Sequence, residues 1–219
     1  TNVIQPVATA ITTIGMDHMD ILGDTLEKIA AQKAGIIKPY TPLVTGKIAD
    51  EALAVIAETA QTNQAKHYQY SIDYQVEILE NERFNYKDDE IHLLNLEKSL
   101  LGLHQIDNAA LAVKLTMVYA HKIGLSLSEE AIRVGLRRTF WPARMEEVSQ
   151  APLTLLDGAH NVHAMQRLLE NLKNEFSGRK ITILFSALVT KDITEMIKMM
   201  QTVDNSKLIL TTFDYPKAL

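Results

Sequence analysis

The stretch Asp157-Gly158-Ala159-His160-Asn161 decides how the rest of this chain is interpreted. It follows the apolar run 153–156 and precedes a segment with helical periodicity, so it marks the junction between a strand and a helix. In an open α/β sheet such junctions lie at the carboxyl ends of the strands, where ligands bind. A carboxylate, an imidazole and an amide at this point favour a binding site for a nucleotide or another small polar ligand.

The segment after this junction continues as alternating helices and strands. Asn161 is placed to cap the next helix. The apolar side chains of that helix share one face: Met165, Leu168, Leu169, Leu172 and Phe176. Residues 181–186 and 208–212 are predicted strands, and a helix between them follows Asp192. This alternation is typical of parallel sheets with right-handed crossovers.

The sequence before residue 140 contains the same alternation and one change of pattern. The predicted strands are 7–14, 41–45 and 66–72, and the predicted helices are 24–35, 50–62, 107–122 and 128–138. Three shorter strand-like runs between residues 74 and 96 predict a small antiparallel meander. Residues 149–152 have the composition of a linker, and the chain is therefore divided into residues 1–146 and 147–219.

The composition is that of an ordinary globular protein, with 47% hydrophobic and 22% charged residues. The net charge of −5 argues against nucleic acid and against anionic membranes as partners. No apolar run reaches membrane-spanning length, and the N-terminus lacks the layout of a signal peptide. The chain has no cysteine, which excludes disulfides and thiolate metal sites and fits a cytoplasmic protein.

Three polar residues near the junction each have a functional and a structural interpretation. Asp157 can accept hydrogen bonds from ribose hydroxyls, or it can simply cap the following helix. His160 can donate to a ligand or accept from it, or it can be an exposed loop residue. Arg144 lies in a Pro-containing segment between the two predicted pieces. Its guanidinium can hold phosphate oxygens, or it can pair with Glu146 or Glu147.

Two segments of the first piece suggest metal or amine chemistry. Asp17 and His18 follow the first predicted strand and carry side chains that bind divalent metals. Lys33 falls on the same helix face as Leu26 and Ile29, which predicts an inward side chain with a desolvated, nucleophilic amine. The alternative is a lysine that extends to solvent at the helix C-terminus, where positive charge is favoured.

Two other predicted helix starts complete the set of candidates. Gln105 and Asn108 carry amides that can form hydrogen bonds with the edge of an adenine base. Asp107 or Asn108 can equally be a plain N-cap. Lys191 can face an anionic substrate, and Asp192 is most simply a cap.

Taken together, these stretches resemble the folylpolyglutamate synthases, often bifunctional as dihydrofolate synthases, of the Mur ligase family. The matching stretches occur in family order along the whole chain: Thr1–Ile4, Ile14–His18, Leu22–Thr25, Ile29-Ala30, Lys33–Lys38, Leu101–Gln105, Asn108–Ala110, Trp141-Pro142 with Arg144 and Glu146, Leu156–Asn161, Lys191-Asp192 and Thr211–Pro216. Each stretch is weak alone, and their joint occurrence is highly specific.

The resemblance implies an α/β fold in two parts. Residues 1–146 would form part of a Mur ligase-type P-loop ATPase domain, with a parallel sheet and the small antiparallel meander. Residues 147–219 would begin the Rossmann-like glutamate-ligase domain. His18 would bind Mg²⁺, and Lys33 would be carbamylated by CO₂ and so become an anionic metal ligand. The residues expected to contact ATP are Asn108, Arg144, Asp157 and His160. Those expected to contact the substrate are Lys191 and Asp192.

The implied reaction is ATP-dependent amide ligation. The γ-carboxylate of a folate, or the carboxylate of dihydropteroate, attacks ATP, and the acyl phosphate reacts with the amino group of L-glutamate. Two Mg²⁺ ions would spread the phosphoryl charge, and a monovalent cation would accompany them. Relatives of this kind are usually monomers, so we expect a monomer here.

Several family elements are missing from these 219 residues. Residues 45–48 contain Gly-Lys but lack the other residues of a P-loop, and no such loop occurs elsewhere. The resemblance places that loop and two Mg²⁺ ligands before Thr1, and further strands after Leu219. Ala143 stands where the family commonly has Gly. We therefore expect a partial chain that is inactive by itself. The alternatives are another Mur-type amino-acid ligase and a non-catalytic nucleotide-binding module.

Overall fold

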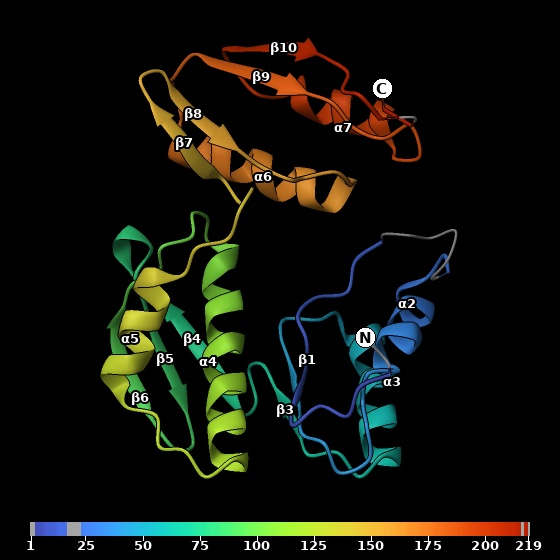
Figure 1. Cartoon of the computed structure of the whole chain (residues 1–219), viewed down its shortest axis with the longest axis vertical. Helices are drawn as coiled ribbons and strands as arrows, with labels where there is room; N and C mark the ends of the chain where they lie inside the picture. The colour runs from blue at the N-terminus through green and yellow to red at the C-terminus, as the bar shows by residue number, and fades with distance from the viewer. Residues whose placement is uncertain (1–2, 17–22, 216, 219) are drawn as a thin grey trace. The chain divides into compact units, whose positions relative to one another are not determined.

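A computed structural model describes residues 3–16, 23–215 and 217–218 of the chain (Figure 1). The chain forms two compact units, residues 1–140 and 141–219. This division falls ahead of the predicted boundary after residue 146, because strand β7 (Glu146–Gln150) pairs with strand β8 (Leu153–Leu156) and both belong to the second unit. Among the described residues, no helix combines the length and the apolar character needed to cross a membrane.

The first unit begins with a three-stranded parallel sheet in the order β1-β2-β3. Its strands are β1 (Thr9–Ile11), β2 (Leu43–Thr45) and β3 (His67–Gln69), and the helices between them are α2 (Leu26–Ala34) and α3 (Asp50–Thr62). These elements confirm the alternation predicted from the sequence. The strands are shorter than the apolar runs, because only three residues of each run pair with a neighbouring strand.

Strand β2 is buried on both sides because its side chains alternate between two hydrophobic clusters. Leu43 packs with Ile29 and Ala30 of α2 and with side chains of α3 on one face. Val44 points the other way and packs with residues of helix α4 (His104–Lys122). The parallel sheet is therefore the middle layer between α2 and α3 on one side and α4 on the other.

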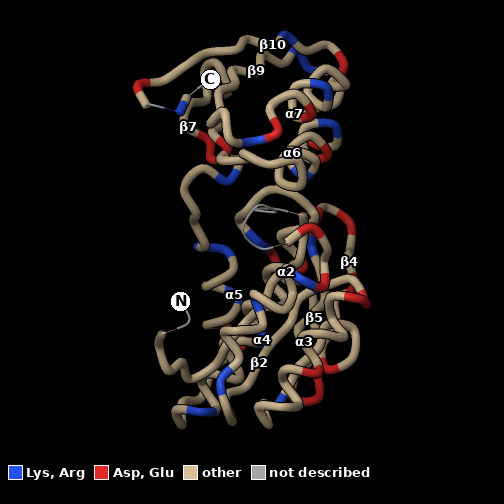
Figure 2. Tube along the Cα trace, turned by 90° about the vertical axis from the view of Figure 1, so that its right-hand side faces the viewer, with Lys and Arg blue, Asp and Glu red and all other residues tan. Residues whose placement is uncertain are grey.

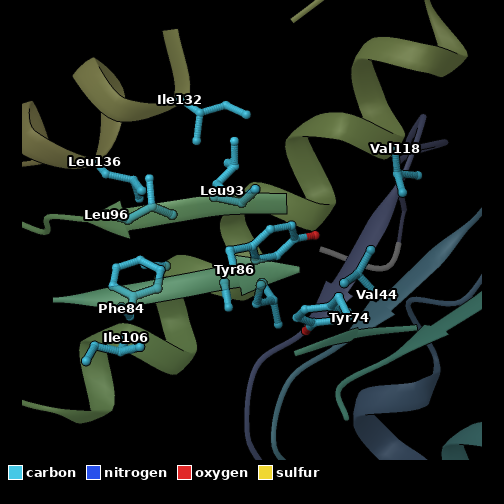
Figure 3. Close-up of a cluster of buried hydrophobic side chains, with 14 residues drawn as sticks. Val44, Tyr74, Phe84, Tyr86, Leu93, Leu96, Ile106, Val118, Ile132 and Leu136 are labelled. Carbon is cyan, nitrogen blue, oxygen red and sulfur yellow. The ribbon is translucent and has the colours of Figure 1, made fainter. Parts of the chain in front are cut away.

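The meander packs against the same helix α4. Its antiparallel strands are β4 (Tyr74–Ile78), β5 (Phe84–Asp88) and β6 (His92–Leu96), with the short 3₁₀ turn η1 (Glu80–Glu82) between the first two. Figure 3 shows Phe84 and Leu96 of the meander in one cluster with Ile106 of α4 and Leu136 of helix α5 (Glu129–Arg138). The predicted meander is confirmed.

Helix α4 begins at His104 rather than at the predicted Asp107. Gly102, with φ +99°, turns the chain into the helix, and the Gln105 N–H donates to the Gly102 carbonyl at 3.0 Å. The interpretation of Asp107 or Asn108 as the N-cap is therefore wrong, since both lie within the first two turns. Their side chains are left for other contacts.

The second unit combines a hairpin with a parallel pair of strands. Strands β7 and β8 are antiparallel, and Ser149 and Gln150 pair with Thr154 and Leu153. The linker predicted at 149–152 is therefore wrong, because these residues belong to a hairpin and its turn. The remaining elements are α6 (Val162–Glu175), β9 (Ile181–Phe185), α7 (Ile193–Met200) and β10 (Ser206–Leu210). Strands β9 and β10 are parallel, as predicted.

The predicted apolar faces of α6 and α7 form the core of the second unit. Met165 and Leu169 of α6 and Met196 and Met200 of α7 are buried in one cluster with Phe185 of β9. The spacing of these residues along each helix places them on one side, so each helix covers the strands with that side alone.

Charged residues of both signs are interspersed along both units (Figure 2). A buried ion pair joins α4 to the meander: the side chains of Lys114 and Asp88 are 1% and 0% exposed, and Nζ lies 3.0 Å from Oδ2. The Asp88 carboxylate also accepts from the Tyr86 hydroxyl and the Ile91 N–H, each at 2.8 Å. Burial by itself would raise the pKa of Asp88, but these hydrogen bonds together hold that pKa below its ordinary value.

We expect Asp88→Asn to lower the free energy of unfolding by about 2 kcal/mol at neutral pH, because the buried Lys114 ammonium then keeps a carboxylate partner only in the exposed Asp89, 3.3 Å away. The pKa of Asp88 is lower in the folded chain than its ordinary value of 3.8. The stability from this carboxylate is therefore present above pH 3.8 and is lost as the pH falls through the folded-state pKa. Urea unfolding measured at neutral and acidic pH checks both statements.

Asp24→Asn is the control, because Asp24 forms an exposed ion pair with Lys28 on α2. Exposed pairs contribute little to stability, so this variant should unfold almost like the unmodified chain. Equal losses for the two variants at neutral pH would contradict the role given to the buried pair.

Candidate functional site

Asp157 follows strand β8 and fastens two backbone segments of the second unit to each other. Its Oδ2 accepts a hydrogen bond from the Met145 N–H at 2.9 Å, and its Oδ1 accepts one from the Ala159 N–H at 2.8 Å. Beside them, the Gly158 N–H donates to the Ala143 carbonyl at 2.8 Å. Residues 143–145 and 157–159 therefore lie side by side.

The cap of helix α6 is Asn161 and not Asp157. Asn161 Oδ1 accepts from the Ala164 N–H at 2.8 Å, as predicted from the sequence. The alternative interpretation of Asp157 as a plain helix cap is therefore wrong. The Asp157 side chain is half-buried, and each carboxylate oxygen has a second lone pair, so it can still accept hydrogen bonds from a ligand.

His160 lies in the exposed part of the same junction. Its Nδ1 is 2.8 Å from the Gly158 carbonyl oxygen. A carbonyl only accepts, so Nδ1 must carry the proton in this contact. In the neutral ring, Nε2 is then the acceptor, and it is the ring atom left to meet a ligand.

Arg144 is exposed between two residues with left-handed backbones, Ala143 at φ +53° and Met145 at φ +48°. Met145 is buried, and its sulfur accepts from the Asn171 amide at 3.3 Å, so one end of the loop is anchored in the core. The Glu146 carboxylate accepts from the Ala143 N–H at 2.8 Å. Within the described residues, Arg144 forms no ion pair with a carboxylate, so the alternative interpretation, a pairing with Glu146 or Glu147, is not observed.

The first unit carries Asn108, which is exposed near the start of α4. Its Nδ2 donates to Oε1 of the buried Gln105 at 2.9 Å. Between them in sequence, Asp107 accepts from the Tyr70 hydroxyl at 2.7 Å. Sequence reasoning missed Tyr70, and no spacing rule could have found it, because it lies 37 residues from its partner.

Lys33 does not have the inward position predicted for it. The buried residues of α2 are Ile29, Ala30 and Ala34, whereas Lys33 is exposed. It stands in the last turn, where a long side chain can reach solvent and a positive charge is favoured by the helix dipole. The structure therefore agrees with the alternative interpretation, in which this lysine extends to solvent at the helix C-terminus. His18 and Asp17 lie outside the described residues.

Lys191 and Asp192 lie at the start of α7. Asp192 Oδ1 accepts from the Glu195 N–H at 3.1 Å, which confirms the cap interpretation. The Lys191 N–H donates to the Leu188 carbonyl at 3.0 Å and so closes the turn before the helix. In the part of the chain that the structure describes, no three His, Asp or Glu side chains form a group able to hold a metal.

The structure thus gathers Arg144, Asp157 and His160 around one junction of the second unit. The junction presents a guanidinium, a carboxylate with free lone pairs and a ring nitrogen. These groups suit a ligand that carries both an anion and hydroxyls. The amide of Asn108 is a separate recognition group on the first unit.

Family models match both parts of the chain. The model of the Mur ligase middle domain matches residues 1–116, and the model of the Mur ligase glutamate ligase domain matches residues 143–219. The first match covers more than half of the 219 residues, and the chain belongs to the Mur ligase family.

Within this family, the relatives of the chain are folylpolyglutamate synthases. The chain is 40% identical over 223 residues to the dihydrofolate synthase/folylpolyglutamate synthase of Bacillus subtilis. It is 35% identical over 223 residues to the folylpolyglutamate synthase of Lacticaseibacillus casei. Both alignments cover 100% of this chain but only 51% and 52% of the relatives, so the chain spans about half of their length.

Solved structures of folylpolyglutamate synthases also align with the chain. An FPGS–AMPPCP–folate complex aligns with 95% of this chain and 52% of its own, at a TM-score of 0.85 and 34% identity. Escherichia coli FolC in complex with DHPP and ADP aligns with 100% of this chain and 50% of its own, at a TM-score of 0.87 and 26% identity. The α/β fold of Mur ligase type predicted from the sequence is confirmed.

We expect Asp157→Ala to loosen residues 143–145, because two backbone N–H groups lose a charged acceptor. Unfolding of the second unit should become easier by about 2 kcal/mol, the order expected for hydrogen bonds to a charged group. Hydrogen exchange followed by NMR should show faster exchange of the Met145 and Ala159 amides. Asp204→Ala, at an exposed position of the same unit, is the control. An unchanged Met145 exchange rate would contradict the role of Asp157.

Proposed function

We propose that this chain serves the ATP-dependent ligation of L-glutamate to the γ-carboxylate of a folate, and that the same chemistry extends to the carboxylate of dihydropteroate. The observation that carries this proposal is the alignment of the full chain, at 40% identity, with an enzyme named for both activities. The similarity to an FPGS complex with AMPPCP and folate supports ATP and a folate as ligands.

The reaction requires two anions to approach each other. A carboxylate oxygen of the folate attacks the γ-phosphorus, the bond from that phosphorus to the β-phosphate oxygen breaks, and ADP leaves. The glutamate nitrogen then attacks the acyl carbon, inorganic phosphate leaves, and the nitrogen loses a proton. Positive charge beside the phosphates and a fixed substrate orientation are what a protein can contribute to such a step.

The junction of the second unit supplies groups suited to the nucleotide. We assign Arg144 to the phosphates, because its exposed guanidinium stands on a loop anchored by Met145 and Asp157. We assign Asp157 to the ribose hydroxyls, because the free lone pairs of its carboxylate can accept hydrogen bonds from them. His160 would meet the nucleotide through Nε2, since Nδ1 is engaged with the Gly158 carbonyl.

We assign the base to Asn108 of the first unit, because its exposed amide carries both a donor and an acceptor. Lys191 and Asp192 would lie near the anionic substrate, although the Asp192 carboxylate also caps α7. The charge of −5, the absence of cysteine and the family resemblance support a cytoplasmic monomer without nucleic acid or membrane partners.

We propose that Mg²⁺ accompanies ATP and that His18 and a carbamylated Lys33 hold one of two ions, with a monovalent cation nearby. Mg²⁺ bound beside the phosphates supplies positive charge to the transferring group. This assignment rests on the family resemblance, since no cluster of metal-binding side chains occurs within residues 3–16, 23–215 and 217–218.

The experiment for this function is transfer of tritiated L-glutamate to tetrahydrofolate by the intact natural protein that carries this sequence, with UDP-linked peptidoglycan precursors as the competing acceptors. We expect labelled folate and no labelled UDP product. Arg144→Ala should slow the reaction by about tenfold or more, since one charge-assisted contact to phosphate is lost.

Arg167→Ala is the matched control, because Arg167 is another exposed arginine of the second unit and pairs with Glu170. Labelled UDP product would assign the chain to another Mur-type ligase. Saturable ATP binding without turnover in the intact protein would make it a nucleotide-binding module. The 219 residues contain no P-loop, so we expect them to be inactive when expressed alone.

The carbamate on Lys33 is tested by native mass spectrometry in bicarbonate buffer. We expect added mass of one CO₂ that disappears in Lys33→Ala and persists in Lys28→Ala, a change on the same helix. A spectrum in which Lys33→Ala carries as much added mass as the unmodified chain would refute the modification at this position.

A further inference from the structure

The carboxylate of Glu146 holds the backbone next to Arg144. Its Oε2 accepts a hydrogen bond from the Ala143 N–H at 2.8 Å. The backbone of Glu146 is itself fixed, because it belongs to strand β7 and stands opposite Leu156 in the hairpin that β7 forms with β8 (Figure 1). A carboxylate carried by a paired strand is a firm acceptor for the loop that precedes that strand.

The loop that carries Arg144 needs such acceptors. Its residues on either side of Arg144, Ala143 and Met145, have left-handed backbones, which residues with a β-carbon rarely adopt. Backbones of this kind persist only where surrounding contacts hold them. Glu146 accepts from the N–H of the first of these residues, and Asp157 accepts from the N–H of the second. The two carboxylates therefore hold the loop on both sides of Arg144.

Glu146 contacts the main chain of this loop and not the arginine side chain. The two residues are only two positions apart, so their opposite charges could have formed an ion pair. In the part of the chain that the structure describes, the Arg144 side chain has neither an ion pair nor a hydrogen bond. The charge of the guanidinium therefore stays available for an anionic ligand.

We infer that Glu146 is a positioning residue, which holds residues 143–145 in the conformation that presents Arg144 to the phosphates of the nucleotide. Glu146 itself need not touch the nucleotide. The inference rests on the proposed nucleotide-binding function and adds to it the residue that keeps the phosphate contact in place.

The sign of the effect distinguishes positioning from electrostatic repulsion. Glu146 and the phosphates are both negative, so the loss of this charge by itself would strengthen phosphate binding. If Glu146 holds the loop, its loss leaves Arg144 in the binding conformation for only part of the time. The apparent dissociation constant then rises by the inverse of that fraction. Positioning and repulsion therefore predict changes of opposite sign.

The test measures the affinities of ATP and adenosine, by calorimetry, in the intact natural protein that carries this sequence. Adenosine has no phosphates, so the ATP-to-adenosine affinity ratio reports the phosphate contact. Glu146→Ala should lower this ratio by about tenfold, which corresponds to a loop that is competent for about one-tenth of the time. Glu146→Gln removes the charge but keeps an oxygen that accepts, so it should retain most of the ratio.

Glu147→Ala is the matched control, because it removes the same charge from the neighbouring exposed position of β7. The ratio should not fall in this variant. Hydrogen exchange followed by NMR should show faster exchange of the Ala143 amide in Glu146→Ala and an unchanged rate in Glu147→Ala.

A second comparison separates positioning from a direct contact between Glu146 and the nucleotide. In an Arg144→Ala background, Glu146→Ala should have no further effect on the ratio, because the group that it positions is gone. In the unmodified protein without ATP, the Ala143 amide should already be protected from exchange, since the loop is held before the ligand arrives. This measurement needs no variant and remains valid if Glu146→Ala fails to fold.

The inference would be overturned, with ATP binding intact, by a ratio in Glu146→Ala that is unchanged or raised, or by a ratio in Glu146→Gln as low as in Glu146→Ala. An equal fall in Glu147→Ala, a further fall in the Arg144→Ala background, or an unprotected Ala143 amide in the unmodified protein would also overturn it. Failure of the unmodified protein to bind ATP at all would overturn the proposed function, and this inference with it.

Discussion

Helix α4 has to bury two different surfaces at once, and the first unit depends on this constraint. One side of the helix covers Val44 of the parallel sheet, and the other covers Phe84 and its neighbours in the meander. The buried pair of Lys114 and Asp88 adds a polar contact of fixed geometry on the meander side. A helix held on two sides and by an ion pair has little freedom to rotate, so the residues at its start keep a fixed place on the first unit.

Much of the fold could be predicted because burial on one face leaves a periodic pattern in the sequence. The faces of α6 and α7 and the strands of the meander were found in this way. Errors arose where pairing depends on the backbone rather than on composition. Residues 149–152 are polar and resemble a linker, yet their backbone completes a hairpin. The start of α4 was placed too late because Gly102, rather than a polar cap, turns the chain into that helix.

The candidate residues could be selected from the sequence, but their contacts could not. The position of Asp157 after a strand marked it as a ligand contact or a cap, and nothing in its spacing revealed that it holds the Met145 backbone. Lys33 was predicted to face inward from α2 but is exposed, because periodicity does not show whether a long side chain near a helix end extends to solvent. The hydrogen bond from Tyr70 to Asp107 exists only because the fold brings distant segments together.

The backbone of Ala143 shows that the loop before β7 places a residue with a β-carbon in the left-handed region. A residue with a β-carbon in the left-handed region costs about 1 kcal/mol relative to glycine. Alanine also gives up fewer conformations than glycine when the chain folds, which returns about 0.4–1 kcal/mol. The strain is the larger of these two terms, because alanine at positive φ destabilises a fold by more than the chain entropy that it saves. The bonds from Gly158 to the Ala143 carbonyl and from the Ala143 N–H to Glu146 use only main-chain atoms of that residue. A glycine at this position would therefore keep both bonds and relieve the backbone strain.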